Sequence, residues 1–425
     1  MSALAIHGGR PVRTRPFPPY QTIGAEERAA VLAVLDSGVL SQFVGVWGPD
    51  FLGGPRVRQL EAAWSEYFGT RHAVSMNSAT SGLYAAVGAA RVAPGDEVIV
   101  SPYTMSASAA AAIVYGAIPV FADIDPETFC LDPRSVAERI TSRTRAIIGV
   151  DLFGHPAPWV EIRQVVAGRD IVLIEDAAQA PGARLGDRYA GTLGDIGVFS
   201  LNYHKTIHSG EGGVVVTDDD DLAERLQLIR NHGEAVVKAK GQDDLVNLIG
   251  FNYRMTEIEA AIAREQLRKL ESLVAPRVAA ADYLTRRLEG VPGLRPPMVR
   301  PGVRHGYYVY PICVDPAELG TDRRTFATAV RAEGVPIAVG YVEPIYRQPM
   351  YQRRIGFGAA GFPFRQPGRP DASYPDGLCP VAERMHEREL CYLANIHSQL
   401  DAKDLEDIAD AIEKVALQIG KPVTV

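Results

Sequence analysis

The chain has 425 residues, of which 47% are hydrophobic and 22% are charged, and its formal net charge is -7. This composition excludes a disordered chain, and the length suggests two or three folding units. A net negative charge without a basic block argues against nucleic acid or an anionic membrane as the main partner, which leaves small molecules. The longest apolar run, 105–121, contains polar and Pro/Gly interruptions and is shorter than the roughly 20 residues of a membrane span.

The four cysteines are widely spaced and form no CxxC pair, and nothing at the N-terminus resembles a secretion signal. We therefore predict a cytoplasmic protein with reduced thiols. We predict no metal site, because no His/Cys cluster has the spacing of metal ligands.

Short apolar runs alternate with helical stretches after an N-terminal arm, 1–22, that is rich in Pro and Arg. The predicted strands are 72–76, 97–100, 118–124, 146–152 and 171–174, and the helices between them are 80–90, 104–114, 133–140 and 159–167. This order predicts an α/β fold with a mainly parallel sheet covered on both faces.

Two more predicted strands follow, at 198–201 and 214–217. Thr256 and Glu259 then form a capping box that opens a long helix. Beyond it we expect a helix to 288, a strand 307–314, a helix 323–333, an irregular stretch 352–380 and a last helix 404–418. We therefore predict a large domain, 1–270, which includes the arm, and a smaller C-terminal α+β domain, 271–425.

Lysine is rare in this chain: only 7 of its 44 basic residues are Lys, and the first of them is Lys205. The other six lie in polar loops, on polar helix faces or in the tail. An amine can be deprotonated and can form a Schiff base, whereas a guanidinium cannot. Lys205 is followed by Gly210, Gly212 and Gly213, which allow a close backbone approach. Lys205 is therefore a candidate covalent catalyst.

Two further patterns are compatible with a bound cofactor, although each also has a purely structural interpretation. Residues 75–82 (Ser-Met-Asn-Ser-Ala-Thr-Ser-Gly) join a strand to a helix, so that their N–H groups either bind a phosphate or form an ordinary capped turn. Asp176 ends a buried strand and either pairs with a cation or caps the next turn. The GxGxxG at 356–361 follows no strand and precedes no helix, so we predict a loop there and no dinucleotide site.

Four motifs follow one another in a specific order. They are Asp-Ala-Ala-Gln at 176–179, Gly-Asp-Ile-Gly-Val-Phe-Ser at 194–200, Lys205 followed by Gly-Glu-Gly-Gly, and Phe-Asn-Tyr-Arg-Met-Thr at 251–256. Together they resemble the DegT/DnrJ/EryC1/StrS family of sugar and aminocyclitol aminotransferases. The segments 5–13 and 130–133 are similar to the antibiotic-pathway branch that acts on aminocyclitols, keto-inositols and related keto sugars.

The resemblance implies a fold-type I pyridoxal 5'-phosphate enzyme that is a homodimer with shared active sites. Such an enzyme moves an amino group from Glu or Gln to a keto sugar or keto-cyclitol in secondary-metabolite or surface-glycan biosynthesis. Lys205 would form the Schiff base, Asp176 would pair with the pyridine nitrogen, and Gln179 would lie beside the phenolic oxygen. The phosphate would be held by Ala79, Thr80, Ser81 and Ser200, and by Asn252 of the neighbouring subunit.

Some features depart from the family pattern and leave alternatives open. Met105 stands where the family stacks an aromatic ring on the cofactor, so either its thioether or Tyr103 supplies that surface. The stretches 41–53 and 353–378 are longer than usual and either line the substrate entrance or are surface insertions. The alternative functions are a dehydratase or cyclising enzyme on the same scaffold, or a non-catalytic cofactor-binding regulator. Lys205 argues against the family's dehydratases, which carry His at this position.

Overall fold

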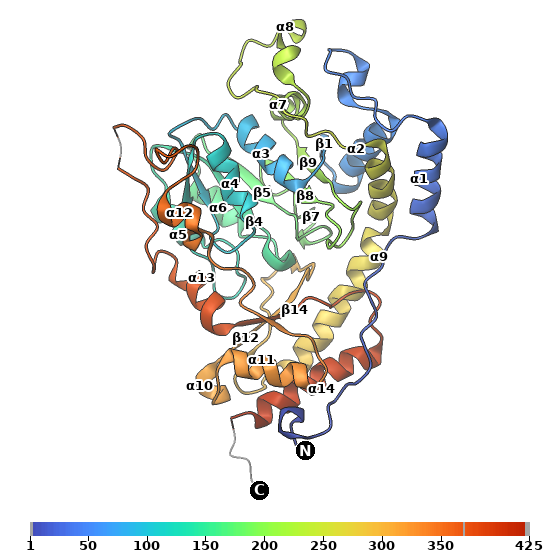
Figure 1. Cartoon of the computed structure of the whole chain (residues 1–425), viewed down its shortest axis with the longest axis vertical. Coiled ribbons are helices and arrows are strands. Elements are labelled where there is room, and N and C mark those ends of the chain that lie inside the picture. Colours follow the sequence, from blue (N-terminus) through green and yellow to red (C-terminus); the bar gives the residue numbers. More distant parts are fainter. Residues whose placement is uncertain (1–2, 369, 421–425) are drawn as a thin grey trace.

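The structure, a computed structural model, describes residues 3–368 and 370–420. Its central sheet consists of β1 (His72–Met76), β2 (Glu97–Val100), β3 (Ile118–Phe121), β4 (Thr144–Val150), β5 (Val172–Asp176), β8 (Ile196–Ser200) and β9 (Gly213–Thr217). The strand order is β1-β9-β8-β5-β4-β2-β3 (Figure 1). The strands from β3 to β8 pair in parallel, and β9 runs antiparallel to both β8 and β1. The predicted α/β fold with a mainly parallel sheet is confirmed.

Helices cover both faces of this sheet. The helices of this part of the chain are α1 (Ala25–Ser37), α2 (Pro55–Phe68), α3 (Ala79–Ala89), α4 (Ala107–Val114), α5 (Pro133–Arg139), α6 (Trp159–Val165), α7 (Asp220–Arg230) and α8 (Val237–Lys240). Successive β9 side chains point to opposite faces, so Val215 packs in the core with α3 while Val214 and Val216 pack with α2. The apolar residues of α2 recur at helical spacing and are buried, which explains why it forms there.

The C-terminal part is built on a second, antiparallel sheet. This sheet has the order β10 (Leu294–Arg295), β12 (Tyr310–Val314), β14 (Leu390–Leu393) and β13 (Ala338–Val339). The helices of this part are α9 (Glu257–Leu288), α10 (Pro316–Leu319), α11 (Arg323–Ala332), α12 (Pro349–Arg353), α13 (Pro380–Arg384) and α14 (Ala402–Gln418). The predicted capping box of Thr256 and Glu259 is present at the start of α9. No described helix is long and apolar enough to cross a membrane.

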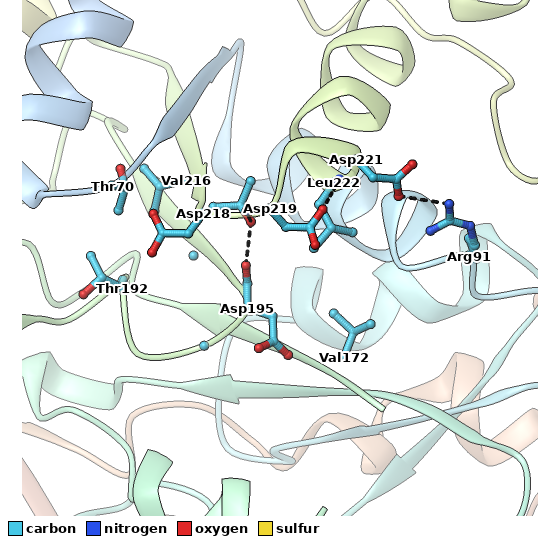
Figure 2. A pocket seen from close by; sticks show the side chains of 14 residues that line it. Thr70, Arg91, Val172, Thr192, Asp195, Val216, Asp218, Asp219, Asp221 and Leu222 are labelled. Atoms are coloured by element: carbon cyan, nitrogen blue, oxygen red, sulfur yellow. Dashed lines mark hydrogen bonds and ion pairs between the residues drawn. The ribbon is translucent and has the colours of Figure 1, made fainter. Parts of the chain in front are cut away.

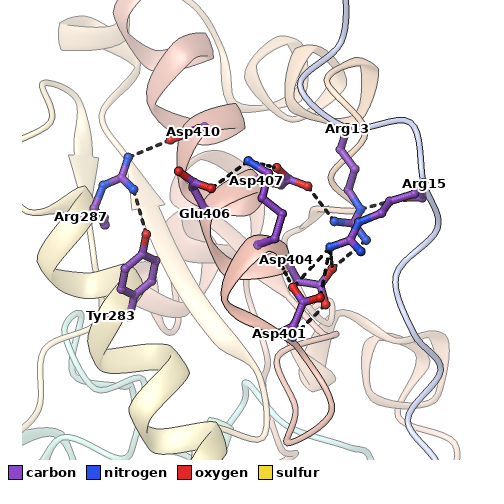
Figure 3. Close-up of polar contacts among 10 residues, drawn as sticks. Arg13, Arg15, Tyr283, Arg287, Asp401, Asp404, Glu406, Asp407 and Asp410 are labelled. Atoms are coloured by element: carbon purple, nitrogen blue, oxygen red, sulfur yellow. Dashed lines mark hydrogen bonds and ion pairs between the residues drawn. The ribbon is translucent and has the colours of Figure 1, made fainter.

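The N-terminal arm lies against the C-terminal part, although the sequence prediction grouped it with 1–270. Leu4 is buried in the apolar core of the C-terminal part. Arg13, itself buried, forms ion pairs of 2.8 Å with both Asp404 and Asp407 of α14, and Arg15 reaches Asp401 and Asp404 from a more exposed position (Figure 3). The arm therefore crosses between the two parts of the molecule.

The two parts are also joined at a junction that the sequence did not predict. The strand predicted at 307–314 begins only at Tyr310, because the preceding residues bond to the loop after β4. Gly306 N donates to Gly154 O (2.8 Å) and Tyr308 N donates to Phe153 O (2.7 Å). Nearby, β11 (Val303–Arg304) adds a strand to the hairpin of β6 (Arg184–Leu185) and β7 (Arg188–Tyr189).

The stretch 353–378 covers the edge of the central sheet at β3. Tyr374 is buried, and its hydroxyl donates to Pro119 O (2.9 Å). The GxGxxG segment forms a loop, as predicted, in which Phe357 N donates to Phe362 O (2.7 Å). Covering an edge strand protects its free backbone groups from pairing with other chains, which gives this stretch a structural role.

Candidate active site

Lys205 lies in the loop between β8 and β9. The loop is closed by backbone hydrogen bonds from Leu201 N to Gly212 O (2.9 Å) and from Ser209 N to Leu201 O (3.0 Å). Burial lowers the pKa of Lys205 to about 8, and the charge of Asp176 opposes this shift. Within the described residues the Lys205 amine forms no hydrogen bond or ion pair. Four other lysines do pair with carboxylates: Lys240, Lys269, Lys403 and Lys414.

Asp176 lies at the carboxyl end of β5 and is almost completely buried. Its carboxylate accepts hydrogen bonds from Ser108 Oγ (3.0 Å) and from Ala178 N (3.2 Å). Burial raises the pKa of Asp176, while these two hydrogen bonds and the charge of Lys205 lower it. Across the described part of the chain this carboxylate has no ion-pair partner. A buried carboxylate is costly unless a cationic donor compensates it, so the site is suited to a cationic N–H.

The first turn of α3 provides the candidate phosphate site. Ser78 caps this helix by accepting a hydrogen bond from Ser81 N (3.0 Å), and Ser81 Oγ donates to Asn77 Oδ1 (2.6 Å). The N–H groups of Ala79 and Thr80 belong to the same first turn, where helical N–H groups have no partner within the helix. Backbone N–H groups in this position bind anions well.

Gly213 brings this turn close to Ser200. Gly213 is paired with Ser200 across β8 and β9, and a Cβ atom on Gly213 would lie 2.6 Å from the carbonyl carbon of Ser78. Only glycine permits this approach. The structure thereby brings together two sets of predicted phosphate residues that are more than a hundred positions apart in sequence.

Gln179 connects the two parts of the molecule. Its Oε1 accepts a hydrogen bond from Phe153 N (2.8 Å), and its Nε2 donates to the hydroxyl of Tyr341 (2.8 Å). The ring of Tyr341 packs edge-on against Phe153, with 4.9 Å between centroids. Phe153 and Tyr341 both have positive φ, which is uncommon for aromatic residues and is often found near functional sites.

The two candidates for the ring-stacking position differ in exposure. Met105 is 66% exposed and lies just before α4, one turn from Ser108, which bonds to Asp176. Tyr103 is completely buried, and its hydroxyl donates to Gly340 O (2.8 Å). The ring of Tyr103 therefore has no open face for a ligand, whereas the Met105 side chain faces solvent.

Asn252 is exposed, and its Oδ1 accepts a hydrogen bond from Arg254 Nε (2.8 Å). The neighbouring Tyr253 O accepts a hydrogen bond from Asn77 N (2.8 Å), so this segment lies beside the phosphate turn of its own chain. The stretch 41–53 packs on the same segment, because Asn231, which bridges to Asn252, donates to the carbonyls of Val44 and Phe51.

Sequence reasoning missed several residues of this site. Ser108 bonds to Asp176, Tyr341 bonds to Gln179, and the ring of Tyr308 lies near the Lys205 amine. Arg277 of α9 donates a hydrogen bond to the carbonyl of Tyr308. The aromatic residues before β12 (His305-Gly-Tyr-Tyr) and the glycine before Tyr341 are the only local signals for them. Neither signal specifies contact with Lys205 or Gln179.

A separate cavity of about 560 Å³ lies at the end of the central sheet where β5 and β8 begin, opposite the end that carries Asp176 (Figure 2). It is lined by Val172, at the start of β5, and by acidic residues that include Asp195 and Asp218. Strand β5 spans about 13 Å between Val172 and Asp176, so the cavity is remote from Lys205. Within the described residues, no group of His, Cys, Asp or Glu side chains could hold a metal ion, there or elsewhere.

Comparison with known proteins gives matches along almost the whole chain. The model of the DegT/DnrJ/EryC1/StrS aminotransferase family matches residues 21–413. L-glutamine:2-deoxy-scyllo-inosose aminotransferase of Streptomyces kanamyceticus is 35% identical, with 97% of each chain covered. The spore coat polysaccharide biosynthesis protein SpsC of Bacillus subtilis is 33% identical over 82% of this chain and 88% of its own.

Solved structures of aminotransferases also match almost the whole chain. An aminotransferase from Psychrobacter cryohalolentis has a TM-score of 0.81 and 28% identity, with 96% of this chain and 100% of its own covered. DesI, solved in the presence of its TDP-sugar product, has a TM-score of 0.79 and 29% identity, with 98% and 97% covered. The chain belongs to the DegT/DnrJ/EryC1/StrS aminotransferase family. It is a pyridoxal phosphate-dependent aminotransferase with the fold of this family.

The observed residues fit this cofactor. Within the described residues, the aminotransferase presents a buried carboxylate that lacks an ion-pair partner at Asp176, first-turn N–H groups without a helical partner at Ala79 and Thr80, and a half-buried amine at Lys205. A pyridine N–H, a phosphate and an aldehyde are the three groups that these features would bind.

Proposed function

We propose that this aminotransferase transfers the α-amino group of L-glutamine to the ketone of a free keto-cyclitol. The arrangement of Lys205, Asp176 and Gln179 is the observation that supports transamination. Support for the substrate class comes from relatives named L-glutamine:2-deoxy-scyllo-inosose aminotransferase, which are 33–35% identical over nearly their whole length. A keto sugar carried on a nucleotide, as in the DesI complex, is the second candidate acceptor.

Each residue has a proposed role in this reaction. Pyridoxal phosphate supplies an aldehyde that condenses with amines and a ring that accepts an electron pair. Asp176 holds the proton on the ring nitrogen, and Gln179 orients the ring from the side of its phenolic oxygen. Lys205 Nζ removes the proton from the donor α-carbon and later delivers a proton to the carbon that carried the ketone. Its lowered pKa, about 8, makes the neutral amine accessible near neutral pH.

In the proposed site, the phosphate is held by Ala79, Thr80, Ser81 and Ser200. Met105 packs on the ring of the cofactor as a soft, polarisable surface. Asn252 reaches the phosphate of a second copy of the chain, since its side chain is exposed beside the phosphate turn.

We also propose that the protein is a homodimer, in agreement with the family resemblance. Exposed apolar side chains gather on the stretch 41–53 and on the segment after α8, at the same end of the molecule (Figure 1). They are Val44, Val46, Trp47, Leu245, Val246 and Ile249. Large apolar side chains that are exposed in number at one end of a molecule suggest an interface there. A cytoplasmic location stays a prediction, supported by four buried, unpaired cysteines.

An isotope-transfer assay tests the proposed function. The holoenzyme is incubated with L-glutamine carrying ¹⁵N in its α-amino group and with either 2-deoxy-scyllo-inosose or a TDP-linked keto sugar. We expect ¹⁵N in an amino-cyclitol by mass spectrometry, and none with Lys205→Arg, which keeps the charge but cannot form an imine. Transfer to the TDP-sugar alone would contradict the free-cyclitol proposal. Loss of water without ¹⁵N transfer would instead indicate a dehydratase.

A further inference from the structure

The Lys205 amine lies over an aromatic ring from outside its own loop. Lys205 Nζ lies 4.7 Å from the centroid of the Tyr308 ring. This distance is within the range of about 6 Å over which the negative face of a ring attracts a cation. The contact crosses from the lysine loop to the junction before β12, so it exists only when the two parts of the molecule are joined.

The backbone that carries Tyr308 is fixed at several points. Tyr308 N donates to Phe153 O (2.7 Å), and Arg277 Nη1 donates to the carbonyls of Tyr307 (3.2 Å) and Tyr308 (3.3 Å). Tyr307 has a φ of 47°, a conformation that a bulky residue keeps only where its surroundings impose it. The backbone that carries the Tyr308 ring is therefore held in place by three hydrogen bonds and by a neighbouring residue in a strained conformation.

Arg277 is also linked to the lysine loop indirectly, through Tyr20 of the N-terminal arm. Its guanidinium lies 5.3 Å from the ring of Tyr20, and the Tyr20 hydroxyl donates to Thr206 O (2.6 Å), next to Lys205. Arg277 is 4% exposed, its Nε has no hydrogen-bond partner, and within the described chain it forms no ion pair. One buried arginine thus ties together the ring and the loop that face each other at the amine.

We propose that Tyr308 is a positioning residue for Lys205, whose ring holds the ammonium form of the lysine at the site by a cation–π contact. Tyr20 and Arg277 hold the lysine loop and the segment of Tyr308 in fixed positions relative to each other. The inference rests on the proposed role of Lys205 as the proton carrier. During turnover the ring would retain the amine near the reacting carbon whenever the lysine is not covalently attached.

The amine is also influenced by other charged and titratable groups, which the test must leave unchanged. Asp176 on β5 favours the charged form of Lys205, and His204 lies beside it in the same loop. Neither residue belongs to the segment that carries Tyr308, so a substitution at 308 leaves both of them in place. Replacing only the ring at 308 therefore isolates its contribution.

The test replaces Tyr308 by phenylalanine and by phenylalanines with increasing numbers of ring fluorines, which keep the shape of the ring but weaken its negative face. The pKa of Lys205 is measured in the full-length protein after removal of the cofactor, from the pH dependence of acylation of Lys205 followed by mass spectrometry. We expect Tyr308→Phe to keep the pKa of the wild type. We expect the fluorinated rings to lower it stepwise, by about one unit in total.

The same fluorinated series at Tyr103, which is buried and forms no cation–π contact with the lysine within the described residues, serves as the matched control and should leave the pKa of Lys205 unchanged. A pKa that stays constant across the series at 308 would overturn the proposal. A stepwise fall seen equally at Tyr103 would also overturn it, since the effect would then be general. Because no substrate or cofactor is used, this result is independent of the isotope-transfer assay.

Discussion

Asp176 illustrates how single residues in this site depend on their surroundings. Burial raises the pKa of its carboxyl group, and among the described residues only two neutral donors, Ser108 and Ala178, bond to it. The cofactor's ring nitrogen would supply the missing cationic partner. The carboxylate and the ring nitrogen would then stabilise each other's charged forms, which neither could maintain alone in a buried site.

Asp176→Asn should slow proton removal from the amino donor by about a hundredfold or more, because a neutral amide cannot keep the ring nitrogen protonated. Cofactor binding should remain measurable, since the phosphate residues are intact. Single-turnover absorbance with L-glutamine measures the rate. Ser108→Ala removes one neutral hydrogen bond to the same carboxylate and should cost about tenfold or less. Equal losses in the two variants would contradict the role of the charge.

At the level of elements, the N-terminal arm is held by a buried arginine. Arg13 forms ion pairs with Asp404 and Asp407 of α14, and all three side chains are at most 6% exposed. Further along the arm, Tyr20 bonds to the loop that carries Lys205. The docking of the arm on α14 therefore also affects the position of the loop that carries Lys205.

Arg13→Ala should lower the free energy of unfolding by about 3 kcal/mol, because Asp404 and Asp407 stay buried and keep only the more exposed cations Arg15 and Lys403. Arg15→Ala is the matched control, since this side chain is 51% exposed, and it should cost about 1 kcal/mol or less. Denaturant titration of both variants gives the two values. Similar losses would show that burial of the Arg13 pair does not stabilise the arm.

For the whole molecule, the proposed dimer and the proposed cofactor site depend on each other. Asn252 is exposed beside its own phosphate turn, and 41–53 packs on the segment that carries it. If Asn252 reaches the phosphate of a second copy, cofactor binding stabilises the dimer by mass action.

Asn252→Ala should therefore weaken cofactor retention and shift the dimer to dissociation at a higher protein concentration. Arg254→Ala removes the partner of the Asn252 amide but keeps the amide itself, so its effect should be smaller. Sedimentation at decreasing concentrations, with absorbance of the bound cofactor, follows both quantities together. A fully active monomer of the wild type would rule out the shared site.

Local sequence patterns were sufficient for much of this protein. The alternation of strands and helices predicted the parallel sheet, and the capping box at Thr256 predicted the start of α9, because both depend on residues close together in the chain. The rarity of lysine singled out Lys205. These features depend on short segments of the sequence and can be predicted without knowing which distant residues are in contact.

The tertiary structure alone decided which side chains meet around Lys205, Asp176 and Gln179. Ser108 is 68 positions from Asp176, and Tyr341 is 162 positions from Gln179. Tyr307 and Tyr341 place their segments by adopting positive φ, which local propensity disfavours and only packing between the two parts can impose. The candidate catalytic groups could be proposed from the sequence, but their neighbours could not, because those contacts arise from the docking of segments whose own sequences favour other conformations.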